Sequence, residues 1–175
     1  MQVRWPHARV LPLAAILIAA SACTRTSDAE SAAARRMVDR EAIDATLQRY
    51  LHGLDRLDAD LYASSFAPDG ELIITGQRHQ GRAAMRAVVA AETALRQSIK
   101  ERGEPPRTLF HFETQSHLEF PAPDRALHSA YWLTVSRTGE SPAGMSILAV
   151  GSSTDELQRI DGKWLITRRE ITLQP

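Results

Sequence analysis

The 175-residue sequence predicts an α+β fold, a cone-shaped barrel in which three N-terminal helices pack in the concave face of a curved, mostly antiparallel sheet. Three observations support this fold class. Apolar residues recur at helical spacing in the first half of the chain, and strand-like segments follow one another in the second half. The dipeptide Asp161-Gly162 is typical of a two-residue hairpin turn. A curved sheet closed by helices encloses a natural pocket for a small molecule.

Helical periodicity defines the first half of the folded part. In residues 39–56 apolar side chains return every three or four positions, so an amphipathic helix is expected there. Asp58 is typical of an N-cap and predicts a short second helix that ends at Pro68. A long third helix is predicted over residues 82–102, and Gly103 ends it.

The remaining elements are predicted strands, turns and loops. One short strand lies between the second and third helices, and four strands follow the third helix. The predicted strands are residues 71–75, 108–120, 126–137, 145–160 and 163–173, with loops at 76–81 and 138–144. Because short connections join antiparallel strands, the last four strands predict a meander.

The first 22 residues resemble a secretory signal peptide. Basic residues precede an apolar run at 11–20, and the small residues Ala20-Ser21-Ala22 follow it. A run of about ten residues is too short to span a bilayer as a resident helix. Residues 1–22 are therefore expected to be removed on export to the bacterial cell envelope.

Cys23 is the only cysteine in the chain, and it follows the small residues as in a bacterial lipobox. It is predicted to be lipidated, which would anchor the protein to the outer membrane. Ordinary cleavage that leaves a free thiol is the alternative. Residues 23–37 are small and polar and are expected to form a flexible tether, so the folded domain is predicted to span residues 38–175.

Composition and motifs exclude several function classes. The chain has 21 basic and 21 acidic residues and no basic block, so a nucleic-acid partner has no electrostatic support. Neither a Gly-x-Ser-x-Gly nucleophile elbow nor a phosphate-binding loop is present. No cofactor is expected.

The segment "TLFHFETQSHLEF" (108–120) places polar residues at every second position. A metal site built from His111, Glu113 and His117 is rejected, because residues six apart on a straight strand lie about 20 Å apart. The pocket-wall interpretation fits only the first part of the strand, around His111 and Gln115, because a long curved strand often has a bulge that changes which face looks inward. His117 and Glu119 would then face solvent or the outer side of the sheet.

His111 is the candidate general acid and base, because histidine can take a proton and return it near neutral pH. Asp55 flanks the apolar stripe of the first helix and is the candidate partner that would orient the ring and stabilise the imidazolium. Tyr50 and Tyr131 are candidate substrate-binding residues that would donate hydrogen bonds to a developing oxyanion. The alternative is a structural histidine with two core aromatics around an inactive cavity.

Several phrases resemble the SnoaL-like branch of the nuclear transport factor two-like superfamily. The resemblance covers residues 39–173 and lies in "LDRLDADLYASSFAPDGEL" (54–72), "GRAAM" (81–85), "FHFETQ" (110–115), "AYWLTV" (130–135) and "DGKWLITRREI" (161–171). It implies the cone fold. This fold hosts dehydratases, isomerases, cyclases and non-catalytic binders.

Within this superfamily scytalone dehydratase is the nearest chemical model. The resemblance aligns its catalytic histidine with His111 and its helix-end aspartate with Asp55. A second catalytic histidine falls near Tyr131 and a catalytic tyrosine near Ile74, so those two roles are absent. Gln115 stands where relatives often carry asparagine.

Two function hypotheses follow. The first is cofactor-independent acid–base chemistry, by dehydration, isomerisation or cyclisation, on a small apolar carbonyl compound. The second is a non-catalytic lipoprotein domain that binds a ligand or docks a partner. Strands such as "AYWLTV" and "MSILAV" are apolar on both faces, and the resemblance adds that this superfamily dimerises through the outer sheet face, so a homodimer is also expected.

Overall fold

The computed structural model describes residues 14–139 and 144–174, which divide into two compact units, Met1–Val38 and Asp39–Pro175. Helix α1 (Ala14–Asp55) begins in the first unit and ends in the second. Residues 23–37, which were expected to form a flexible tether, are helical, and their role as a tether stays a prediction. Their "AESAAARR" run is rich in alanine and arginine, which have high helix propensity.

The expected signal peptide and lipidation concern residues that are described only in part. Residues 1–13 lie outside the described chain, as do the side chains of residues 14–28, including that of Cys23. In the described ranges no helix is long and apolar enough to cross a membrane.

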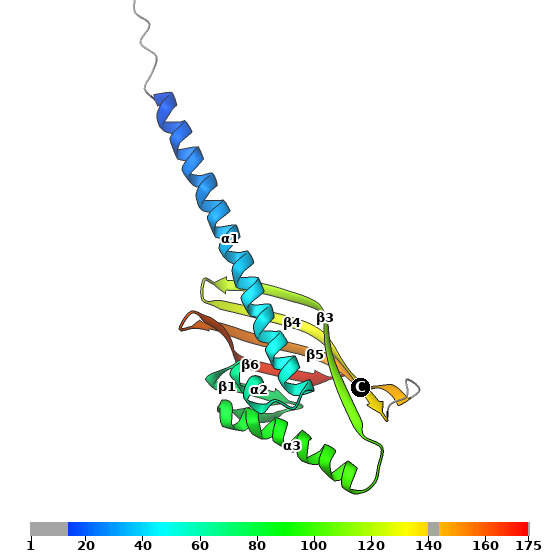
Figure 1. The fold of residues 1–175 in the computed structure, drawn as a ribbon. Coiled ribbons are helices and arrows are strands. Elements are labelled where there is room, and N and C mark those ends of the chain that lie inside the picture. Colours follow the sequence, from blue (N-terminus) through cyan, green and yellow to red (C-terminus); the bar gives the residue numbers. More distant parts are fainter. Residues whose placement is uncertain (1–13, 140–143, 175) are drawn as a thin grey trace, which may run out of the picture. The chain divides into compact units, whose positions relative to one another are not determined.

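The second unit contains a six-stranded sheet with the order β2-β1-β6-β5-β4-β3 (Figure 1). Its strands are β1 (Phe66–Ile74), β2 (Gln77–Gln80), β3 (Arg107–Ala122), β4 (Arg125–Thr138), β5 (Met145–Ile160) and β6 (Lys163–Leu173). Only the β1–β6 pair is parallel, so the sheet is mostly antiparallel and the predicted meander from β3 to β6 is confirmed.

The predicted hairpin between β5 and β6 is also confirmed. Ile160 pairs with Lys163 across the turn. Asp161 and Gly162 both have positive φ, 49° and 76°, as a two-residue hairpin of this kind requires.

Two elements near the start of the sheet differ from expectation. Strand β1 begins at Phe66 rather than at Glu71, and an irregularity in its pairing with β6 accommodates the Pro-Asp-Gly run that was interpreted as a helix end. Residues 76–81 were expected to be a loop, but β2 forms there as an exposed polar edge strand without an apolar pattern. Two helices precede β1, and the third follows β2.

The helices of this unit pack against one face of the curved sheet (Figure 1). Asp58 caps α2 (Ala59–Ser64), where its carboxylate accepts a hydrogen bond from the Leu61 amide at 2.9 Å. Helix α3 (Gly81–Glu101) follows β2. Helix and strand residues share one apolar core, which includes Ile43, Leu47, Tyr62, Phe66, Met85, Val89, Leu157 and Ile166.

Strand β3 contains the predicted bulge. Its pairing with β4 shifts between Thr114 and His117, and Gln115 has a positive φ of 51°. Beyond the bulge, Leu118 and Phe120 pack against the apolar core. The bulge therefore changes which positions of the strand face inward.

Candidate functional site

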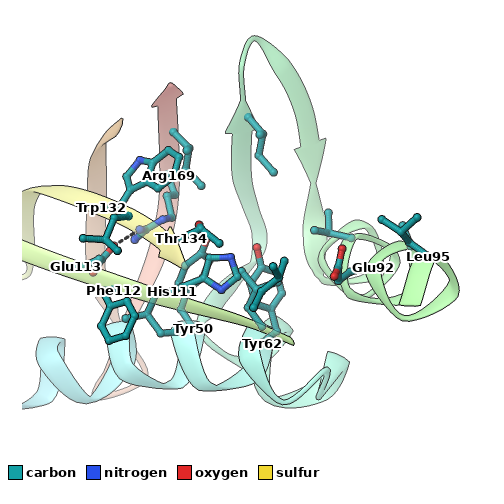
Figure 2. Close-up of a pocket in the computed structure, with 18 residues that line it drawn as sticks. Tyr50, Tyr62, Glu92, Leu95, His111, Phe112, Glu113, Trp132, Thr134 and Arg169 are labelled. Carbon is teal, nitrogen blue, oxygen red and sulfur yellow. Dashed lines mark hydrogen bonds and ion pairs between the residues drawn. The ribbon is translucent and has the colours of Figure 1, made fainter. Parts of the chain in front are cut away.

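A cavity of about 420 Å³ lies in the second unit, between the helices and the inner face of the sheet. Figure 2 shows the side chains that line it. Its walls are mainly apolar, with Leu51, Leu54, Ile74, Val88, Ala91, Leu95, Leu109, Phe112, Leu133 and Ile171. This volume is in the range of small-molecule binding pockets.

His111 lines this cavity and contacts Asp55, the last residue of α1. The His111 ring Nδ1 lies 2.6 Å from Asp55 Oδ1, and the backbone N–H of His111 donates to the same oxygen at 3.1 Å. The two side chains are 20% and 25% exposed. Two contacts to one carboxylate fix the ring orientation. Nδ1–H donates to Asp55, and Nε2 is left as the nitrogen that can accept a proton.

Tyr50 and Tyr62 form an aromatic wall of the cavity, with ring centroids 4.9 Å apart. Burial raises the pKa of Tyr50, although the charge of Arg169 partly opposes this shift. Burial also raises the pKa of Tyr62 well above its ordinary value. Both phenols therefore stay neutral near neutral pH and can donate hydrogen bonds. Tyr50 thus lines the cavity, and its contact with a substrate stays a prediction.

An ion pair between Glu113 and Arg169 lines one part of the cavity (Figure 2). Glu113 lies two residues after His111 on β3, and both residues line the cavity. Arg169 comes from β6 and is only 2% exposed. Its guanidinium lies over the Tyr50 ring, with Cζ 4.2 Å from the ring centroid.

Behind this ion pair the sheet carries a second histidine–aspartate contact. His128 Nδ1 lies 2.7 Å from Asp155 Oδ2, and Arg169 Nη1 donates to both oxygens of Asp155 at 3.0 and 3.1 Å. The three residues are cross-strand neighbours, which explains how their side chains meet. Burial alone would lower the pKa of Arg169, but the charges of Asp155 and Glu113 outweigh it and raise this pKa above its ordinary value.

Tyr131 and Gln115 do not lie in the cavity, contrary to the sequence prediction. Tyr131 is 56% exposed, while its neighbours Trp132 and Ala130 lie on the inner side of β4. The apolar odd-numbered residues of β4 were expected to face inward. The structure instead buries most of the even-numbered residues, which are mainly polar or small. Gln115 is exposed because it lies in the β3 bulge.

Several residues that line the cavity were not predicted as binding candidates from the sequence, among them Tyr62, Glu113, Trp132 and Arg169. Glu113 was detectable, since period two places it on the same strand face as His111. Trp132 is held where it lies by a hydrogen bond from its indole N–H to the Ser152 carbonyl at 3.0 Å. Gly151 is opposite Trp132, and a Cβ at Gly151 would come within 2.6 Å of the indole.

In residues 14–139 and 144–174 no group of three histidine, cysteine or acidic side chains is placed to hold a metal ion. The polar side chains on the cavity walls that can form hydrogen bonds or transfer protons include His111, Tyr50, Tyr62, Glu92, Glu113 and Thr134.

The family model of the SnoaL-like domain matches residues 35–170. The chain belongs to the SnoaL-like domain family. This match covers both residues of the His111–Asp55 pair and the strands that line the cavity up to residue 170 of β6. No match was found among curated proteins.

Solved structures agree with this family. A nuclear transport factor 2-like protein with a cystatin-like fold from Novosphingobium aromaticivorans has a TM-score of 0.67 and 23% identity, over 82% of this chain and 86% of that one. A proposed scytalone dehydratase from the same organism has a TM-score of 0.63 and 21% identity, over 82% and 89%. A hexachlorocyclohexane dehydrochlorinase, LinA type 2, has a TM-score of 0.65 and 21% identity, over 81% and 88%. At these identities the likeness establishes the nuclear transport factor 2-like cone fold of the SnoaL-like domain.

Proposed function

We propose that this SnoaL-like domain is a cofactor-independent enzyme that performs acid–base chemistry, of the dehydratase, isomerase or cyclase type, on a small apolar carbonyl compound. The observation that supports this best is the His111–Asp55 contact of 2.6 Å at the wall of a largely apolar cavity. A carboxylate on Nδ1 leaves Nε2 ready to accept a proton from a bound molecule.

The first step is removal of a proton from the carbon next to the carbonyl group. His111 Nε2 takes this proton, and the electron pair of the C–H bond passes into an enolate. Asp55 stabilises the imidazolium that forms, because it already contacts Nδ1–H. The neutral hydroxyl of Tyr50 or Tyr62 stabilises the enolate oxygen by donating a hydrogen bond. Return of the proton to another carbon completes an isomerisation. In an elimination the enolate electron pair instead forms a C=C bond as the bond to a leaving group on the next carbon breaks.

The names of two structural neighbours support an elimination. A dehydratase removes water and a dehydrochlorinase removes hydrogen chloride. Both reactions begin or proceed with loss of a proton from carbon, which a histidine base in an apolar cavity can supply.

Deuterium exchange tests the proposal without knowledge of the natural substrate. 2-Tetralone has acidic protons beside its carbonyl group and a size suited to the cavity. In D₂O the protein is expected to accelerate deuterium uptake by 2-tetralone, followed by NMR, above the rate in buffer. Binding of 2-tetralone without any acceleration would contradict the enzyme proposal and favour the alternative, a non-catalytic ligand-binding or docking domain.

Export and membrane attachment are also proposed, on the basis of the sequence. Residues 1–22 are removed, and Cys23 carries a lipid that anchors the domain to the outer membrane. The intact mass of membrane-extracted protein should include the acyl groups. Unchanged membrane retention of the Cys23→Ser variant would contradict lipidation at Cys23.

A homodimer through the outer face of the sheet is the proposed assembly. Large apolar side chains are exposed on β4 and β5, among them Leu127, Tyr131, Ile147 and Val150. The helices cover the opposite face, so a second copy is the cover that this face lacks. Light scattering at micromolar concentration that gives the mass of a monomer would contradict this assembly.

A further inference from the structure

We infer that the substrate carries a protonated amino group, and that Glu113 binds this group with the carboxylate oxygen that Arg169 leaves free. This inference rests on the proposed function. It narrows the substrate to an otherwise apolar carbonyl compound that bears an amine. Glu113 lines the cavity, and its side chain is 10% exposed.

One oxygen of the Glu113 carboxylate is accessible from the cavity. The other oxygen, Oε1, is paired with Arg169 Nη2. No residue in the ranges 14–139 and 144–174 donates a hydrogen bond to Oε2, and this atom is not one of their buried atoms without a partner. Oε2 is therefore open to the cavity that Glu113 lines. A carboxylate oxygen can only accept, so the ligand group that meets it must be a donor.

The charges around Glu113 favour a cationic donor. Arg169 lies between two carboxylates, because its Nη2 contacts Glu113 and its Nη1 donates to both oxygens of Asp155 at 3.0 and 3.1 Å. With histidines counted as neutral, two carboxylates and one guanidinium leave one net negative charge. The three side chains are at most 10% exposed, so water screens this charge little. A ligand ammonium compensates the charge and also donates the hydrogen bond that Oε2 lacks.

Anionic and neutral ligand groups fit this wall less well. Both terminal nitrogens of Arg169 contact carboxylates, and its Cζ lies 4.2 Å from the centroid of the Tyr50 ring. A ligand carboxylate would have to displace Glu113 or Asp155 to reach this guanidinium, and it would face their negative charge. A neutral hydroxyl group could donate to Oε2, but it would leave the net charge without a counter-ion where the dielectric is low.

Glu92 is the other acidic side chain that lines the cavity in the described part of the chain. It already has two cationic neighbours, Arg96 Nε at 2.8 Å and Arg107 Nη2 at 4.0 Å. The charge of Glu92 is therefore compensated within the protein, whereas Glu113 belongs to a cluster with a negative excess. This difference assigns the amine to Glu113.

Four probes with one ring system test the inference by calorimetric binding at neutral pH. They are 2-aminotetralin, which is protonated there, 2-tetralol, 2-methyltetralin and tetralin-2-carboxylate. The unmodified protein is expected to bind 2-aminotetralin about tenfold more tightly than each of the others, as a charge-assisted hydrogen bond allows. Equal or tighter binding of another probe, or no binding of the amine at millimolar concentration, would overturn the inference.

The Glu113→Gln variant localises the preference, because it removes the charge and keeps the shape. Its affinity for 2-aminotetralin should fall about tenfold while that for 2-methyltetralin stays the same. Glu119→Gln is the matched control on the same strand and should keep the preference, since Glu119 is exposed and pairs with His117. Persistence of the preference in Glu113→Gln, or an equal loss for all four probes, would overturn the inference.

The probe series on the unmodified protein decides alone if circular dichroism shows that Glu113→Gln does not fold. The binding assays are also independent of turnover. Absence of deuterium exchange into 2-tetralone would contradict the proposed function and leave the amine preference unaffected. Deuterium exchange without any preference for the amine would overturn this inference and leave the proposed function standing.

Discussion

The domain contains two histidine–aspartate pairs with nearly the same geometry and different surroundings. In both, the histidine Nδ1 meets a carboxylate oxygen, at 2.6 Å for His111–Asp55 and 2.7 Å for His128–Asp155. The first pair is 20% and 25% exposed and its histidine lines the cavity. The second is 5% and 0% exposed, and its aspartate also holds Arg169.

We propose that this difference separates a reactive pair, His111–Asp55, from a structural one, His128–Asp155. A histidine can act on a ligand only if its second nitrogen can reach that ligand. The carboxylate of a reactive pair should serve the histidine alone. Asp155 instead contacts both His128 and Arg169 across three strands, and it holds Arg169 against the aromatic wall of the cavity. The short distance between histidine Nδ1 and the carboxylate is common to both pairs, so it does not distinguish the reactive pair from the structural one.

The largest expected effect on stability comes from the structural pair. Asp155→Asn removes a buried charge that Arg169 needs, and the free energy of unfolding should fall by about 3–5 kcal/mol, as measured by urea denaturation. Glu156→Gln changes an exposed neighbour on the same strand and should have little effect. Equal stability of the two variants would show that the network contributes nothing.

The reactive pair should respond in rate rather than in stability. Asp55→Asn keeps the shape of the side chain but weakens its hold on the imidazolium, so deuterium exchange into 2-tetralone should slow by about 10- to 100-fold. Asp60→Asn is the control, because Asp60 pairs with Arg86 at the surface. An unchanged exchange rate in Asp55→Asn would remove Asp55 from the mechanism.

Alkaline pH should lower the free energy of unfolding through Tyr50 and Tyr62, the two tyrosines of the cavity wall. The pKa values of Tyr50 and Tyr62 are raised above 10.0 in the folded state, mainly by burial. Above the ordinary tyrosine pKa the unfolded chain loses protons that the folded chain keeps, so the free energy of unfolding should fall as pH rises. Denaturation followed from pH 9 upward should show a steeper fall in the native protein than in Tyr50→Phe or Tyr62→Phe. Identical slopes would contradict the burial argument.

The smallest effect on the fold is expected at Tyr131, which lies outside both pairs. Tyr131→Ser should change the free energy of unfolding of the monomer by less than about 0.5 kcal/mol. The same variant should weaken the proposed dimer, whereas Gln97→Ala on the exposed side of α3 should not. Sedimentation that shows equal association of both variants would move the dimer contact away from Tyr131.

The order of most elements could be predicted from the sequence, because periodicity and turn chemistry are local. Helix 39–56 and the Asp161-Gly162 hairpin follow from such signals. Strand β2 could not be predicted, since its four residues are polar and owe their conformation to pairing with β1. The helix across residues 23–37 was missed because polarity was given more weight than helix propensity.

The candidate site was only partly predictable. Family resemblance identified His111 and Asp55, and the structure brings them into contact. Hydrophobic alternation failed on β4, because His128 and other polar residues occupy its inner face. Burial of His128 depends on Asp155, a residue far along the chain, and a single sequence does not reveal such cross-strand partners.

Paired substitution of the two histidines tests the central claim most directly. The rate of deuterium exchange into 2-tetralone and the free energy of unfolding would be measured for His111→Gln and His128→Gln. We expect His111→Gln to lose at least about 100-fold in exchange rate with little change in stability. His128→Gln should lower stability and retain exchange in the molecules that stay folded. Full exchange activity in a folded His111→Gln variant would contradict the assignment of His111 as the acid–base residue.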